Sequence, residues 1–156
     1  MIRRNVRSIC LPHCNFLTIC PYSLIVIAHL TVVDSNKLQG IGVRGRLLCG
    51  KLPLLGAKVK IVDLDPRPDW DDLMGETTTD ENGLFRVSGA TKEESDIEVV
   101  LKIYHDCMDE HRPCQRRTFW RLPSSYYNNG TLSEWFEVGV VNMELQFPQE
   151  ERDCRH

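Results

Sequence analysis

The sequence predicts an all-β domain that folds as a two-sheet antiparallel β-sandwich of seven to eight strands. Apolar and polar residues alternate in several segments, as in Ala57-Lys58-Val59-Lys60-Ile61, and a period of two is typical of strands that bury one face. Asn-Gly pairs at 82–83 and 129–130 supply residues that suit tight turns. No long amphipathic helix competes for the core, so a second sheet is expected to cover the first.

Eight segments carry the strand pattern. In chain order they are 41–49, 57–64, 75–79, 84–88, 97–105, 115–122, 134–138 and 140–147. The last of these is defined by Val141, Met143, Leu145 and Phe147, which alternate with polar residues. Short strands separated by turn residues are the pattern of an antiparallel sandwich.

The first 35 residues have the features of a secretory signal peptide, which leaves residues 36–156 as the mature domain. Three arginines lie within the first seven residues, and no charged residue follows until Asp34. Val33 and Ser35 supply the small residues of a cleavage site. An uncleaved anchor helix is the alternative, but Pro21 and His29 interrupt the uncharged run, whereas a membrane span takes about 20 consecutive apolar residues. We therefore predict a secreted, extracellular protein.

The chain has seven cysteines, which this cleavage would divide into two groups. Cys10, Cys14 and Cys20 belong to the signal segment, and Cys49, Cys107, Cys114 and Cys154 to the mature domain. Four cysteines in an oxidising compartment predict two disulfides. The short loop between Cys107 and Cys114 favours a bond between these two, with Cys49 then bonded to Cys154. The other two pairings remain open, because the sequence does not choose among them.

Two metal sites compete with simpler interpretations. His105, Cys107, His111 and Cys114 could bind zinc, but in a secreted chain we expect the two cysteines to be oxidised. Five carboxylates lie within ten residues, at Asp63, Asp65, Asp69, Asp71 and Asp72. Calcium prefers such oxygen ligands on loops, although the spacing of a helix-loop-helix calcium site is missing and clustered acids are usually solvated. Our main expectation is a protein without a metal or other cofactor, with calcium as the alternative.

The charge of the chain argues against a nucleic-acid partner. The formal net charge is -3, whereas binding to phosphate backbones relies on a basic surface. A local exception is a group of four arginines, Arg112, Arg116, Arg117 and Arg121. These arginines could bind anionic phospholipid headgroups or another anion, or they could form ordinary surface ion pairs.

Asn129-Gly130-Thr131 is a sequon for N-glycosylation on an expected turn. A sugar on Asn129 would agree with secretion, although such a triplet also occurs by chance.

Four segments together carry a resemblance to a known family. They are VRGRLLC at 43–49, TDENGLFRVSG at 79–89, LKIYHDC at 101–107 and VGVVNMEL at 138–145. In this combination the chain resembles the nematode transthyretin-like family over about residues 40–154. The resemblance implies a secreted prealbumin-like sandwich of seven or eight strands, which agrees with the strand pattern. It implies little about activity, because most members of the family have none assigned.

Two classes of function follow. We favour a non-catalytic binding or bridging module that uses loops near 63–75 or 107–117 to contact a cell-surface protein, a lipid headgroup or a small apolar ligand. The alternative is an enzyme like the hydroxyisourate hydrolases, which share the fold and end in Tyr-Arg-Gly-Ser. This chain instead ends in Asp153-Cys154-Arg155-His156, so it departs from the hydrolase signature. The partner and the oligomeric state are not determined by the sequence.

Overall fold

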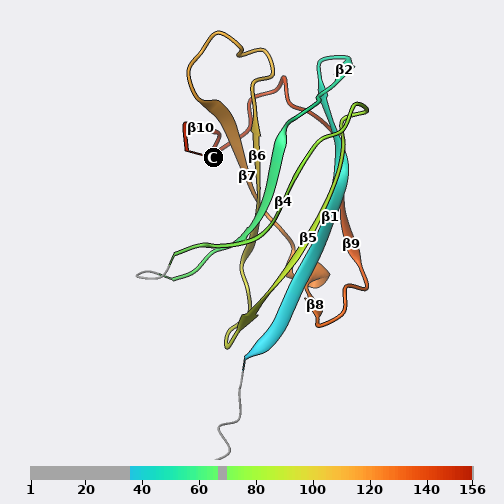
Figure 1. The fold of residues 1–156 in the computed structure, drawn as a ribbon, viewed down its shortest axis with the longest axis vertical. Coiled ribbons are helices and arrows are strands. Elements are labelled where there is room, and N and C mark those ends of the chain that lie inside the picture. The colour runs from blue at the N-terminus through green and yellow to red at the C-terminus, as the bar shows by residue number, and fades with distance from the viewer. Residues whose placement is uncertain (1–35, 67–69, 156) are drawn as a thin grey trace, which may run out of the picture. The chain divides into compact units, whose positions relative to one another are not determined.

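The computed structural model describes residues 36–66 and 70–155, which form one β-sandwich (Figure 1). The predicted signal segment, with Cys10, Cys14 and Cys20, lies outside the described residues, as does Asp69. Within the described part, no helix combines the length and the apolar character that crossing a membrane requires.

Two sheets of five strands each make up the sandwich. Sheet A contains β1 (Lys37–Cys49), β2 (Leu52–Pro53), β5 (Leu84–Glu93), β8 (Asn128–Asn129) and β9 (Trp135–Asn142). Sheet B contains β3 (Lys58–Asp63), β4 (Asp72–Thr78), β6 (Val99–His105), β7 (Gln115–Arg121) and β10 (Glu151–Asp153). A single turn of 3₁₀ helix, η1 (Ser124–Tyr126), joins β7 to β8. The prediction of an all-β sandwich is confirmed.

Strand β1 is the centre of sheet A and β6 lies inside sheet B. On one side β1 pairs antiparallel with β5 and, near its end, with β2, and on the other side it pairs antiparallel with β8. The order in sheet B is β10-β7-β6-β3-β4, and all of these pairs are antiparallel. One pair departs from the predicted antiparallel pattern, because β9 runs parallel to β1.

The core lies between the sheets and follows the alternation of the strands. Ile41, Val43 and Leu47 of β1 are fully buried, whereas Arg44 between them is exposed. Strand β6 is buried along nearly its whole length, because it is paired on both edges, with β3 and with β7. The remaining core side chains include Val59, Ile61, Phe85, Val87, Leu101, Ile103 and Met143.

At one edge the sandwich closes through glycine. A Cβ atom at Gly89 of β5 would collide with the carbonyl group of Met74 on β4, and one at Gly75 would lie 2.7 Å from the carbonyl oxygen of Ser88. Only glycine lets the backbones of the two sheets approach this closely.

The prediction of two separate strands at the end of the chain is wrong. Residues 134–138 and 140–147 were expected as separate strands, but a single strand, β9, spans Trp135–Asn142 and carries an irregularity at Gly139, whose φ is 78°. The chain leaves the sheet after Asn142, because the side-chain oxygen of this residue accepts hydrogen bonds from the N–H groups of Gly50 and Glu144. Met143 is still buried, but Leu145 is 60% exposed. The alternation from 141 to 147 is therefore not that of a strand.

Candidate functional site

Two loops meet at one end of the sandwich, at the top of Figure 1. One runs through residues 50–57, between β1 and β3, and the other through residues 106–114, between β6 and β7. A disulfide between Cys49 and Cys107, whose Cα atoms are 5.6 Å apart, joins the bases of these loops. The bond ties the end of a strand in sheet A to the end of a strand in sheet B, so the loops are held at a defined separation.

All four predicted cysteines form disulfides, but the favoured pairing is wrong. Cys107 is bonded to Cys49, and Cys114 to Cys154. The reason lies in the tertiary arrangement. Asp153 of β10 pairs with Gln115 of β7, which brings Cys154 beside Cys114, while Cys107 is buried between the sheets at 3% exposure. Since both cysteines of the zinc alternative are oxidised, their thiolates are not available as zinc ligands.

The two loops line an open cavity of about 780 Å³. Its first wall is apolar, and Leu52 and Leu55 on it are 71% and 64% exposed. Its second wall, on the 106–112 segment, carries Met108 at 74% exposure together with charged residues such as Asp106 and Glu110. The loop near 107–117 that the sequence singled out therefore lines a cavity. The apolar 52–55 segment was missed, because two exposed leucines on a turn carry no sequence signal of their own.

His105 lies at the inner edge of this cavity, at the end of β6. The side chain is 1% exposed, and its Nδ1 accepts a hydrogen bond of 3.2 Å from the N–H of Cys107. The ring hydrogen therefore belongs on Nε2, for which the described residues offer no hydrogen-bond partner. Burial, and then the neighbouring Arg116, lower the pKa of His105 from 6.5 to about 4. The imidazole is thus neutral at pH 7.

Arg116 is buried, which corrects its prediction as part of a surface patch. Its exposure is 7%, because Arg116 and the buried residue Thr118 lie on the same face of β7, toward the core. The guanidinium donates to both carboxylate oxygens of Glu150 (2.6 and 2.8 Å) and to the carbonyl oxygens of Cys107, Met143 and Leu145. Although burial alone raises the pKa of Glu150, the hydrogen bonds from Arg116 and the N–H of Phe147 lower it overall. Arg116 thus binds the 106–114 loop to the segment that follows β9.

The other three predicted arginines do not join Arg116 in one surface. Arg117 and Arg121 lie on the outer face of sheet B, where Arg117 pairs with Glu151 and Asp153 and Arg121 pairs with Glu98. Arg112 is on the loop, 3.6 Å from a carboxylate oxygen of Asp109. Each of these arginines therefore has an acidic neighbour. The structure does not assemble the four into a continuous basic patch.

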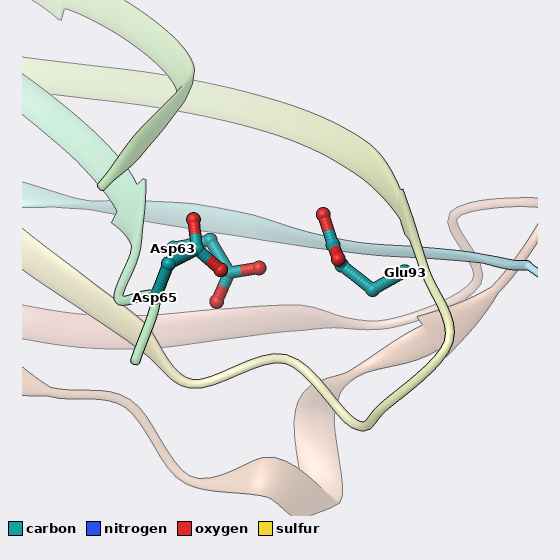
Figure 2. Close-up of side chains that lie close together, drawn as sticks. All are labelled: Asp63, Asp65 and Glu93. Atoms are coloured by element: carbon teal, nitrogen blue, oxygen red, sulfur yellow. The ribbon is translucent and has the colours of Figure 1, made fainter. Parts of the chain in front are cut away.

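A group of three carboxylates lies elsewhere, where β3 and β5 end. The side chains of Asp63, Asp65 and Glu93 offer oxygens that all lie within 4.8 Å of one another (Figure 2). Burial, and then the charges of Glu93 and Asp72, raise the pKa of Asp63 from 3.8 to about 6. One carboxylate oxygen of Asp63 accepts a 2.7 Å hydrogen bond from the N–H of Glu98.

This group contains only part of the predicted calcium cluster. Asp71 is paired with Lys102 at 3.2 Å, and Asp72 is exposed on β4. Glu93 was missed, since it belongs to a different strand and only the folded sandwich brings it near Asp63. Calcium binding here stays a prediction.

Asn129 is exposed on β8, and Gly130 after it has a φ of 83°. Of the expected Asn-Gly turn, only Gly130 has a positive φ, because Asn129 belongs to β8. Glycosylation of Asn129 stays a prediction.

Comparison with known proteins agrees with this architecture. The model of the transthyretin-like family matches residues 44–123. The chain belongs to this family. Transthyretin-like protein 33 of Caenorhabditis elegans is 45% identical over 76% of this chain and 83% of its own length. Transthyretin-like protein 5 of the same organism is 44% identical over 78% of this chain and 88% of its own length, and transthyretin-like protein 46 is 39% identical over 83% and 74%.

Family membership confirms the resemblance seen in the sequence. The relatives carry the name of a fold family, and none of these names denotes an enzyme. The two disulfides are consistent with an extracellular protein of this family.

Proposed function

We propose that this protein is a secreted, non-catalytic binding module that holds a small apolar ligand in the cavity at the loop end of the sandwich. The observation that carries the proposal is the cavity of about 780 Å³ between two loops that the Cys49–Cys107 disulfide joins. Binding sites for small molecules typically have volumes of about 300–1,000 Å³. Of the ligands considered from the sequence, a small apolar molecule suits this space best.

The chemistry of the walls supports the same proposal. Leu52, Leu55 and Met108 line the cavity and are 64–74% exposed. Exposed apolar groups that gather in one place often mark a binding site, and covering such a side chain is worth about 1.5–3 kcal/mol. The charged residues of the opposite wall would remain in contact with water at the rim.

Secretion is supported by the charge pattern of the first 35 residues and by the oxidation of all four cysteines in the described domain. The alternative of a hydroxyisourate-hydrolase-like enzyme is disfavoured at the C-terminus. Where the hydrolases end in Tyr-Arg-Gly-Ser, this chain has Cys154, which is bonded to Cys114. The disulfide therefore attaches the C-terminal segment covalently to the residue before β7.

The experiment uses the protein as secreted by eukaryotic cells and N-phenyl-1-naphthylamine, a neutral apolar probe that fluoresces on burial. We expect saturable binding that weakens by at least about tenfold in the Leu55→Ser/Met108→Ser variant. The matched control is Leu38→Ser/Leu73→Ser, which removes two exposed leucines outside the cavity and should bind like the wild type.

Equal losses in the two double variants, or no saturable binding by the wild type, would contradict the cavity proposal. Hydrolysis of hydroxyisourate by the same preparation would contradict the non-catalytic part. Mass spectrometry of the secreted protein would report the cleavage site and the state of Asn129.

A further inference from the structure

The outer face of sheet A carries three arginines on two neighbouring strands. Arg44 and Arg46 lie on β1 and Arg86 on β5. Their immediate neighbours Val43 and Val87 belong to the core, so the alternation of the strands turns the arginines outward. Arg44 is directly opposite Arg86 in the register of the two strands. Cα atoms in such a pair are about 4.5–5.5 Å apart, and Arg46 follows Arg44 at about 7 Å along the strand.

The three side chains line a hollow of about 550 Å³. The Nε of Arg44 donates to Glu137 at 2.6 Å, and the Nε of Arg46 donates to the carbonyl oxygen of Asn82 at 2.8 Å. The guanidinium of Arg86 lies 4.0 Å from the ring centroid of Trp135. These contacts hold each guanidinium in place and leave other N–H groups free to donate.

Acidic partners are scarce in the hollow. Glu137 pairs with Arg44, and Asp80 accepts the N–H groups of Asn82 and Leu84. Within residues 36–66 and 70–155, Arg46 and Arg86 have no carboxylate at ion-pair distance, whereas all three arginines of β7 have one. Like charges directly opposite on two strands are unfavourable. An anion that binds between them would remove this cost.

We propose that the outer face of sheet A binds a sulfated polysaccharide through Arg44, Arg46 and Arg86. A planar guanidinium donates two parallel hydrogen bonds to an oxyanion such as a sulfate group. A flexible chain with several sulfate groups can contact three arginines spread over two strands at the same time. A single small anion cannot. Because the arginines line a hollow, a flat bilayer surface reaches them less easily than a polysaccharide chain does. The net charge of -3 means that the protein as a whole does not attract polyanions, so binding has to come from a local surface.

The experiment measures binding of a heparin-type sulfated oligosaccharide to the full secreted protein by calorimetry. We expect Arg46→Gln/Arg86→Gln to weaken binding by at least about tenfold, because charge-assisted hydrogen bonds are lost. The matched control is Arg112→Gln/Arg121→Gln, which changes the net charge equally and leaves the outer face of sheet A intact. This control should bind within about twofold of the wild type. A desulfated oligosaccharide should not bind.

Three results would overturn the proposal. They are no binding by the wild type, equal weakening in the two double variants, and binding to vesicles of anionic phospholipid without binding to the sulfated oligosaccharide. A circular dichroism spectrum and a melting temperature close to those of the wild type exclude unfolding as the cause of any loss. The naphthylamine probe is neutral and binds elsewhere, so its binding should be unchanged in Arg46→Gln/Arg86→Gln.

Discussion

His105 and Arg116 are direct partners on neighbouring strands of sheet B, and Arg44 and Arg86 are direct partners in sheet A. The first pair is buried at 1% and 7% exposure, and the second is exposed. In the interior the guanidinium of Arg116 has hydrogen-bond acceptors for all its N–H groups, and the lowered pKa of His105 keeps the imidazole neutral. On the surface water solvates both guanidinium groups, so the pair does not need protein acceptors to offset a cost of burial.

The comparison shows that burial decides what a pair of basic residues can do. The interior pair stabilises the loop end of the sandwich, since Arg116 contacts both the 106–114 loop and the segment around Glu150. We expect the surface pair to add little to stability, and its guanidinium groups are the ones that we propose for ligand binding. Changes at buried and at exposed charged residues test the effect of burial, from the largest expected effect to the smallest.

Arg116→Ala should have the largest effect on stability. It leaves the carboxylate of Glu150 and three carbonyl groups without their donor, and removal of one partner of a buried ion pair costs about 3–5 kcal/mol. Urea denaturation followed by fluorescence measures the free energy of unfolding. The control Arg112→Ala, at an exposed pair, should stay within about 1 kcal/mol of the wild type. A similarly small loss in Arg116→Ala would show that the buried network does not stabilise the fold.

His105 should make the domain sensitive to acid. Its pKa is about 4 in the folded protein and 6.5 without the fold, so the unfolded chain binds the proton more readily. The stability that depends on neutral His105 is complete above pH 6.5 and is lost as the pH falls through 4, by on the order of 3 kcal/mol. His105→Asn keeps an acceptor for the N–H of Cys107 but does not titrate. The stability of this variant should fall less between pH 6.5 and 4, and parallel pH profiles would refute the assignment.

Asp63→Asn should show the opposite pH dependence. The raised pKa of about 6, against 3.8, means that ionised Asp63 destabilises the fold as the pH rises from 4 to 6. The variant should therefore be more stable than the wild type by about 1–3 kcal/mol at pH 7, and equally stable below pH 4. Unfolding at a series of pH values checks this, and an unchanged difference across the range would contradict it.

The same pair of proteins tests the calcium prediction. Calcium at pH 7 should raise the melting temperature of the wild type more than that of Asp63→Asn if the carboxylates of Asp63, Asp65 and Glu93 hold the ion. Equal responses would refute calcium binding at this group.

The smallest effect on stability should come from the surface arginines. Arg86→Gln should change the free energy of unfolding by no more than about 0.5 kcal/mol, which is usual for an exposed side chain. Arg46 is half-buried and donates to the carbonyl oxygen of Asn82, so Arg46→Gln should cost about 0.5–1.5 kcal/mol. For Arg86, loss of the contact with Trp135 is offset by relief of the repulsion from Arg44. Urea denaturation of these variants and of Arg116→Ala under the same conditions compares their free energies of unfolding directly. A loss above about 2 kcal/mol would mean that the outer face of sheet A is structural.

Much of the fold could be predicted from local sequence patterns. Alternation in β1, β3, β5 and β7 and the turn at Asn82-Gly83 depend on residues close together in the chain, and these predictions are confirmed. The burial of Arg116 could also have been predicted from its alternation with Thr118, but four arginines near one another suggested a surface patch instead. The segment from Val141 to Phe147 was wrongly predicted as a strand, because apolar and polar residues keep alternating after Asn142, where the strand ends.

By itself, the sequence determined the all-β class, the family and the participation of four cysteines in disulfides. Only the tertiary structure decided which cysteines pair, which arginine is buried and that Glu93 joins Asp63. It also decided that two loops line an open cavity and that Arg44 lies opposite Arg86. The physical reason is the range of the interactions. Turns and alternation are set by neighbours in the chain, whereas a disulfide, a buried charge or a cross-strand pair depends on strands far apart in sequence, whose register follows from packing of the whole core.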